Sequence, residues 1–143
     1  MVDKLNELFI NFCLKRKKSL TPTRLELIKT LSTYSKPVTA YQLQKDINSK
    51  GNNLNIATVY RVIEFWVNMG LVHKISSLNK FFMCFRPEEK HTHMINFCTD
   101  CEEVYESCNK SMGINIEKSS KDLGLKLLQN EPIEIPVLCP NCQ

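Results

Sequence analysis

The sequence predicts an α+β protein in which a helical N-terminal part ends in a β-hairpin and is followed by a smaller α/β part. Three observations predict this division: capped helical periodicity before residue 70, two short β-rich runs between residues 71 and 85, and two Cys-x-x-Cys pairs after residue 97. A part much smaller than about 70 to 80 residues usually needs a metal or another cross-link for stability. The cysteine pairs therefore fit the small C-terminal part.

Four helices are predicted in the N-terminal part because apolar residues recur there at helical spacing. Thr21, Thr39 and Asn55 are the predicted N-caps of the second, third and fourth helices, and a proline follows the first of these caps. The first predicted helix covers residues 4–17, and the second begins after Thr21. The third extends from Thr39 to about Gly51, and the fourth extends from Asn55 to Gly70.

Two β-rich runs, 71–75 and 80–85, follow the fourth helix and are separated by the turn-forming residues Ser-Ser-Leu-Asn. They predict a β-hairpin. Helices followed by a hairpin are the order of elements in a winged helix-turn-helix domain, which is predicted for residues 1–85.

A short polar tract at residues 86–90 is the predicted hinge, because it contains proline and lies where the charge of the chain changes sign. The second domain is predicted to span residues 91–143. Its expected elements are strand 91–97, strand 104–107, helix 114–123, strand 125–128 and strand 133–138.

The two parts carry opposite net charges. Residues 1–80 contain 13 Lys and Arg against 5 Asp and Glu, a net charge of +8, whereas residues 81–143 contain 6 against 10, a net charge of −4. The first part is therefore expected to bind a polyanion such as double-stranded DNA. No run approaches the roughly 18 apolar residues of a membrane span, and residues 1–20 lack the apolar core of a signal peptide. We expect a cytoplasmic protein with no membrane partner.

Cys98, Cys101, Cys139 and Cys142 form the two Cys-x-x-Cys pairs, which are separated by 37 residues. Two-residue gaps let both thiolates of a pair bind one ion, and two pairs complete the tetrahedron that structural zinc prefers. Packed thiols or redox pairs are the alternative, but seven cysteines in a reducing compartment favour metal binding. A zinc-dependent nucleobase deaminase also needs His-x-Glu and Pro-Cys-x-x-Cys, and neither motif occurs.

Further candidate zinc ligands surround the predicted hinge. They are His73 and Cys84 on the hairpin, His91 and His93 after the hinge, and Glu106 beyond the first cysteine pair. Mixed nitrogen, oxygen and sulfur ligands suit a more exchangeable zinc site than four thiolates do. Residues i and i+2 share one face of a strand, so both histidines after the hinge could reach one ion. A single histidine is more often a hydrogen-bonded side chain, but all three histidines of the chain lie close together, which favours a second metal site.

Several short motifs extend along nearly the whole chain. They include Thr58-Val59-Tyr60-Arg61, the histidine-rich strand before the first cysteine pair, and the closing cysteine pair. Together they resemble the ferric uptake regulator family. Within that family, Thr39-Ala40-Tyr41, Leu71-Val72-His73-Lys74 and the eleven-residue step from His73 to Cys84 look like the zinc uptake regulator branch. The sequence lacks the His-His-x-His cluster of the iron-sensing members.

The resemblance implies a homodimeric, zinc-responsive repressor of zinc uptake genes that binds a palindromic operator and has no enzymatic activity or small-molecule substrate. It assigns structural zinc to the four cysteines of the two pairs. It assigns regulatory zinc to His73, Cys84, His91 and Glu106, and DNA contacts to Tyr41, Tyr60 and Arg61. A sensor of iron, manganese or peroxide with the same fold remains an alternative. A zinc-binding enzyme or carrier is another, although it would not explain the basic first half.

Overall fold

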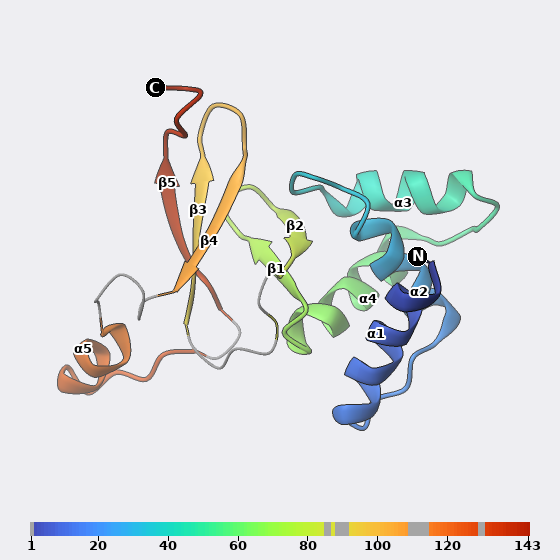
Figure 1. Ribbon diagram of the computed structural model, residues 1–143, viewed down its shortest axis with the longest axis horizontal. Coiled ribbons are helices and arrows are strands. Elements are labelled where there is room, and N and C mark those ends of the chain that lie inside the picture. The colour runs from blue at the N-terminus through green and yellow to red at the C-terminus, as the bar shows by residue number, and fades with distance from the viewer. Residues whose placement is uncertain (1, 85–86, 88–91, 109–114, 129–130) are drawn as a thin grey trace.

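The structure, a computed structural model, describes residues 2–84, 87, 92–108, 115–128 and 131–143. Figure 1 shows the N-terminal helices on one side, the larger sheet on the other and the β1–β2 hairpin between them. The described elements, in chain order, are α1 (Val2–Lys15), α2 (Pro22–Leu31), α3 (Ala40–Ser49), α4 (Ile56–Asn68), β1 (Val72–Ile75), β2 (Lys80–Met83), β3 (His93–Cys98), β4 (Val104–Cys108), α5 (Ile116–Asp122) and β5 (Ile133–Val137). This order agrees with the predicted α+β class. None of the described helices is long and apolar enough to cross a membrane.

Three of the helices begin at the predicted capping residues. The side chains of Thr21, Thr39 and Asn55 each accept a hydrogen bond from the backbone N–H three residues later, at 3.3, 3.1 and 2.8 Å. Each cap satisfies one of the N–H groups that the start of a helix leaves without an intrahelical partner. Asn55 therefore fixes the start of α4, the helix that carries the predicted DNA-binding residues Tyr60 and Arg61.

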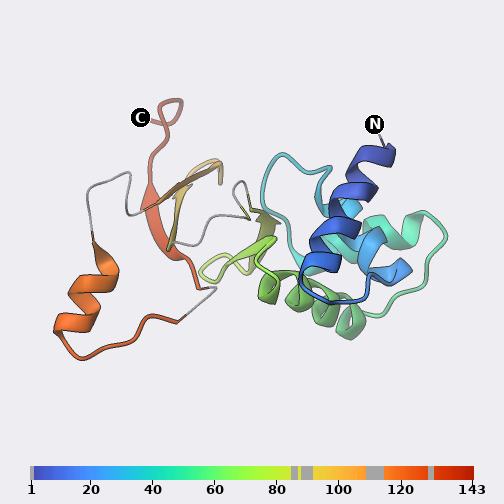
Figure 2. The ribbon, with the colours of Figure 1, turned by 60° about the horizontal axis from the view of Figure 1, so that its bottom comes forward.

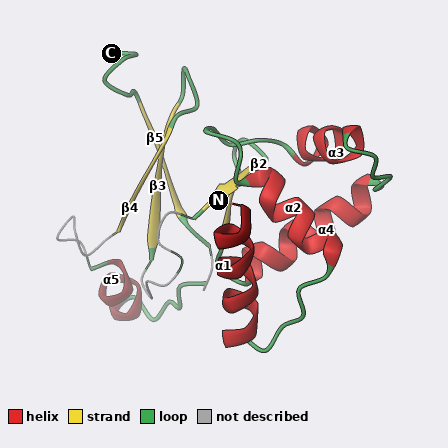
Figure 3. Cartoon of the chain, turned by 45° about the vertical axis from the view of Figure 1, so that its right-hand side comes forward, coloured by secondary structure: helices red, strands yellow, loops and turns green. Residues whose placement is uncertain are grey.

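The larger apolar core lies among α1, α2, α3 and α4, and Figure 3 shows α1, α2 and α4 packed together. Val59, Ile63 and Trp66 of α4 are fully buried, whereas Arg61 and Glu64 are exposed. The indole N–H of Trp66 also donates a hydrogen bond to a backbone carbonyl of α2 at 3.1 Å. The core therefore determines which face of α4 points to solvent.

The hairpin presents different side chains on its two faces. β1 and β2 pair antiparallel, with His73 opposite Phe82. Because side chains alternate across a strand, neighbouring residues face opposite ways. Val72 and Phe81 belong to the helical core on one face. The register places a second set of residues on the opposite face, namely His73, Ile75, Lys80 and Phe82.

The C-terminal part contains a three-stranded sheet in the order β4-β3-β5, in which β3 runs antiparallel to β4 and parallel to β5. A second apolar cluster joins this sheet to the hairpin: Ile75 and Phe82 from the hairpin pack with Ile95 and Phe97 from β3. One face of the hairpin therefore lies against one face of the sheet. Figure 2 shows α5 set off to one side of the sheet, and none of its residues is buried.

One predicted strand is wrong. Residues 125–128 form no strand, and Leu125 and Leu128 are 62% and 75% exposed. Within the described residues, neither β4 nor β5 has a further partner strand, so this segment joins no ladder of backbone hydrogen bonds. A short apolar run alone does not specify a strand.

The remaining differences concern the ends of elements. The first helix covers Val2–Lys15 rather than residues 4–17, and the second hairpin strand ends at Met83 rather than at residue 85. Such shifts of about one to two residues are usual, because the ends of helices fray. The predicted hinge, 86–90, lies outside the described residues apart from Pro87.

The cap of α4 gives a first testable prediction. Asn55→Ala should lower the free energy of unfolding by about 1 kcal/mol, because it removes the side chain that caps this helix. Asn55→Ser should remain close to the parent, since serine caps helices about as well as asparagine. Urea unfolding followed by the fluorescence of Trp66, the single tryptophan, measures both variants. Equal losses for the two would contradict a capping role.

Candidate functional site

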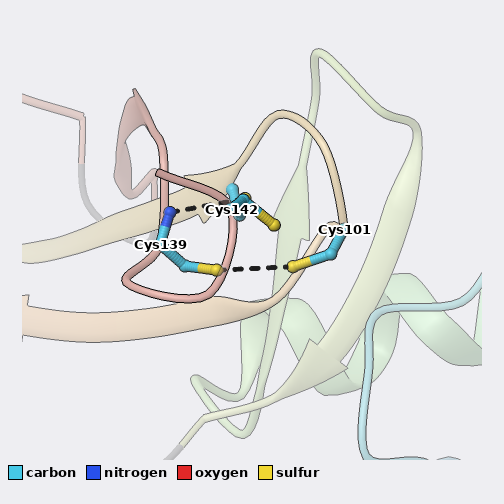
Figure 4. Close-up of side chains that lie close together, drawn as sticks. Cys101, Cys139 and Cys142 are labelled. Carbon is cyan, nitrogen blue, oxygen red and sulfur yellow. Dashed lines mark hydrogen bonds between the residues drawn. The ribbon is translucent and has the colours of Figure 1, made fainter.

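Four cysteine side chains converge at one end of the three-stranded sheet. β3 ends at Cys98, and its parallel neighbour β5 ends at Val137, which lies beside Cys98 in the register. Parallel pairing therefore brings the residues after β5 next to the turn after β3. One ligand atom from each of Cys98, Cys101, Cys139 and Cys142 lies within 4.8 Å of the others. Figure 4 shows the sulfur atoms of Cys101 and Cys139 facing each other, 3.7 Å apart.

The backbone around Cys98 favours its thiolate form. The N–H groups of Cys101 and Cys139 lower the pKa of Cys98 to about 6, and the second of these donors lies 3.5 Å from the sulfur. In contrast, the neighbouring side chains of Cys139 and Cys101 raise the pKa of Cys142 to about 12. Four thiolates at such short range repel one another unless a cation lies among them. The four sulfur donors therefore fit a structural zinc ion, for which a closed set of four cysteines is typical.

A second cluster of ligand atoms lies between the hairpin and the sheet. One ligand atom from each of His73, Cys84, His93 and Glu106 lies within 4.8 Å of the others. His73 comes from β1 and Cys84 directly follows β2, whereas His93 begins β3 and Glu106 lies on β4. This cluster, the hinge cluster below, connects the two parts of the chain through side chains.

Glu106 lies at the centre of the hinge cluster. Its Oε1 atom is 3.4 Å from His73 Nε2 and 3.5 Å from Cys84 Sγ, and it contacts His93 Nδ1. The side chains of Glu106 and His73 are only 4% and 8% exposed. Polar groups buried to this extent need partners, and a metal ion would serve all four. Two imidazoles, one thiol and one carboxylate are a donor set that fits zinc.

The histidine that the structure places in the hinge cluster is His93, one of the two candidates after the hinge, whereas the resemblance assigned this role to His91. His91 lies outside the described residues. His93 pairs with Cys108, and Glu106 pairs with Ile95, so the register places His93 diagonally across from Glu106 on the same face of the sheet. The alternation of His91 and His93 was visible in the sequence, but it does not say which histidine lies next to Glu106.

The three residues assigned to DNA contact lie on α3 and α4. Tyr41 is 62% exposed, and its ring meets that of Tyr60 edge-on, with 6.5 Å between the centroids. Tyr60 in turn packs edge-on against Phe81 of the hairpin at 6.4 Å. Arg61 is exposed, and no ion pair among the described residues joins it to Glu64. The guanidinium is therefore available to a partner on the outer side of α4.

The sequence pattern of the Ferric uptake regulator family matches residues 15–133 of this chain. The chain belongs to this family. Among the curated relatives, the zinc uptake regulation protein of Escherichia coli strain K12 is 30% identical over 131 residues. The match covers 91% of this chain and 76% of that protein.

Solved structures of the ferric uptake regulator family have the same fold. A zinc uptake regulator complexed with zinc and DNA has a TM-score of 0.85 and 28% identity, covering 98% of this chain and 93% of that one. Holo XcZur has a TM-score of 0.82 and 27% identity, covering 98% and 96%. Apo XcZur, with 28% identity and the same coverage, has a TM-score of only 0.54. The structure of this chain is therefore more similar to the holo form than to the apo form of XcZur.

The four-cysteine cluster gives a second testable prediction. Cys98→Ser or Cys142→Ser leaves an incomplete set of thiolates, so the C-terminal part should lose its zinc and unfold or monomerise, since a structural zinc site contributes directly to folding. Metal analysis and sedimentation under reducing conditions measure the two effects. Cys108→Ser, outside both clusters, should retain the metal. Dimeric Cys142→Ser protein with its full zinc content would contradict the assignment.

Proposed function

We infer that this protein is a zinc-responsive, DNA-binding repressor of zinc uptake genes that acts as a homodimer. The observation that carries the inference is the hinge cluster, because its four ligands come from both the winged helix-turn-helix and the sheet of the second part. A metal bound by all four holds these two parts together. The cluster thus links metal binding to the position of the DNA-binding helices, as a metal-dependent regulator requires.

Zinc is the effector that the ligand chemistry supports. Cys84 offers a thiolate, which zinc binds well and which magnesium and manganese, as oxygen-preferring ions, do not. The Escherichia coli relative is a zinc uptake regulation protein, and one of the similar structures is bound to zinc and DNA. The greater similarity to the holo form of XcZur also supports a metal-loaded arrangement.

The four hinge ligands set the orientation of the winged helix-turn-helix in the proposed mechanism. A two-fold dimer reads a palindrome only when its two recognition helices lie about 34 to 36 Å apart. His73 and Cys84, bound to the same ion as His93 and Glu106, fix the orientation on which this spacing depends. Coupling between two ligands is typically about 1 to 3 kcal/mol and acts in both directions. The zinc-free protein therefore retains weak operator binding.

Exposed residues of α3 and α4 provide the proposed DNA contacts. Arg61 is placed to donate two hydrogen bonds to one guanine edge in the major groove, the commonest specific contact of arginine with DNA. Tyr60 precedes Arg61 on α4, the ring of Tyr60 meets that of Tyr41, and Phe81 supports the ring of Tyr60. The net charge of +8 over residues 1–80 supplies the attraction to phosphates.

We assign residues 1–85 to the DNA-binding domain, 86–90 to the hinge and 91–143 to the metal-binding dimerisation domain. Two observations support these bounds: Phe81 is still part of the helical core, and the second sheet begins at His93. A repressor works where its operator is, so the protein is assigned to the cytoplasm.

Operator binding titrated against free zinc, with iron and manganese in parallel, tests the proposed function. Zinc should raise the affinity of the parent by about 5- to 150-fold, the usual range for coupled ligands. Cys84→Ser and His73→Ala should abolish most of this response while the four-cysteine zinc and the fold remain, since neither residue belongs to that cluster. Variants that respond like the parent would place the regulatory ligands elsewhere. A response to iron or manganese alone would favour the alternative sensor.

Arg61→Ala tests base recognition. We expect it to weaken operator binding by about 1 to 3 kcal/mol, the usual contribution of a bidentate contact to a base, while binding to random-sequence DNA stays nearly unchanged. Lys15→Gln, which removes a phosphate-binding charge instead, should weaken both kinds of binding together and reduce their salt dependence. Competition assays at several salt concentrations separate the two effects. An unchanged ratio of operator to random-sequence affinity in Arg61→Ala would show that Arg61 reads no base.

A further inference from the structure

The interface between the hairpin and the sheet has two ends. The hinge cluster occupies one end, and the apolar contact of Ile75 and Phe82 with the sheet lies next to it. At the other end, Lys80 Nζ forms an ion pair with Glu102 Oε2. Glu102 directly follows Cys101, so the hairpin contacts the turn that carries the first cysteine pair. We call residues 98–103 the cysteine turn.

A second lysine of the DNA-binding part reaches the same turn. Lys36 Nζ donates a hydrogen bond to the backbone carbonyl of Cys101 at 3.0 Å. The segment that carries Lys36 is joined to the hairpin, because Val38 and Phe81 exchange two backbone hydrogen bonds of 2.9 and 2.8 Å. Lys36 and Lys80 therefore belong to one connected unit, and they contact two consecutive residues of the cysteine turn.

Glu102 adopts a backbone conformation that is uncommon for a residue with a side chain. Its φ angle is +61°, in the left-handed region that glycine adopts with least steric cost. The Glu102 N–H closes the turn by donating to the carbonyl of Cys98 at 2.9 Å. This position therefore holds a strained glutamate, and its carboxylate pairs with Lys80. Non-glycine residues in this region persist where the surrounding structure holds them, often at functional contacts.

We propose that Lys80, Glu102 and Lys36 are positioning residues that dock the winged helix-turn-helix on the cysteine turn, so that the four-cysteine site supports the DNA-binding arrangement as well as the fold. This proposal rests on the proposed zinc-dependent DNA binding. The four cysteine ligands fix the turn, and the turn presents the Glu102 carboxylate and the Cys101 carbonyl to the two lysines. The hinge cluster holds one end of the interface and the docking contacts hold the other.

Coupling between binding sites is reciprocal. If zinc in the four-cysteine site raises operator affinity by fixing the turn for docking, operator DNA must raise the zinc affinity of that site by the same factor. This consequence separates docking from a merely local ion pair, which would leave zinc retention independent of DNA.

Neutral variants of the ion pair test the proposal. With zinc saturating, Lys80→Gln and Glu102→Gln should each lower operator affinity about two- to fivefold, the upper range for a partly exposed ion pair. Lys74→Gln is the matched control, because it removes one positive charge from the same hairpin at an exposed position on the opposite face. Any loss in this control measures the general effect of charge on DNA binding. The charge-exchanged double variant, Lys80→Glu with Glu102→Lys, should recover most of the operator affinity that Lys80→Glu alone loses.

Zinc retention supplies the second measurement. In competition with a strong chelator at equilibrium, operator DNA should protect the four-cysteine zinc of the parent, and protection should be about two- to fivefold weaker in Lys80→Gln than in Lys74→Gln. Both variants should have the melting temperature of the parent, which excludes a general loss of stability. The proposal is overturned if Lys80→Gln has the same operator affinity as Lys74→Gln and operator DNA protects its four-cysteine zinc to the same extent.

Hydrogen exchange without DNA tests the docking contact itself. Backbone amides of residues 76–83 and 99–103 should exchange faster in Lys80→Gln than in Lys74→Gln, because both segments lose the contact that holds them together. If the parent protein does not bind DNA in response to zinc, the proposed function is contradicted. The exchange rates would still decide whether docking occurs. Unchanged exchange would overturn the proposal, as would faster exchange with no loss of operator affinity.

Discussion

The contact of one hairpin face with one sheet face is the constraint on which the rest of the structure depends. Side chains alternate across strands, so a register shift of one residue would turn every ligand and every apolar contact to the wrong face. In the observed register, His73 shares a face with Phe82, and His93 shares a face with Ile95. A single register therefore places the metal ligands, the apolar contacts and the docking charges, and a shift of that register would misplace all of them.

The sizes of the two apolar clusters explain why metal can control the arrangement. Among the described residues, the helical core contains 18 buried residues, whereas the cluster between the hairpin and the sheet contains four. Apolar burial is roughly proportional to the area removed from water, so it stabilises the DNA-binding domain far more than it stabilises the contact between the domains. A ligand that binds one relative arrangement of the two domains modestly more tightly than another can then shift the population toward that arrangement. We propose that this ligand is a metal bound at the buried carboxylate of Glu106, which His73, Cys84 and His93 surround.

Features that depend on nearby residues could be predicted from the sequence, and features that depend on distant pairing could not. The caps at Thr21, Thr39 and Asn55, and the inward face of α4, follow from local spacing. The four cysteines were recognisable because two-residue gaps have a chemical meaning. In contrast, residues 125–128 needed a partner strand that the described sheet does not provide. The position of His93 beside Glu106 needed the β3–β4 register, and the contact of Lys36 with Cys101 joins residues 65 positions apart.

The two metal sites differ in what their ligands connect, and this difference explains their different roles. The four cysteines all belong to the second domain, where the parallel pairing of β3 with β5 already brings the two pairs together. A metal there adds to the stability of one small domain, which has few other means of support. The ligands of the hinge cluster come from both domains, so a metal there adds to the stability of one relative arrangement of those domains. Four thiolates suit permanent retention, whereas mixed ligands suit exchange. Because the cysteine turn also contacts Lys36 and Lys80, the permanent site provides the fixed surface against which the exchangeable site positions the winged helix-turn-helix.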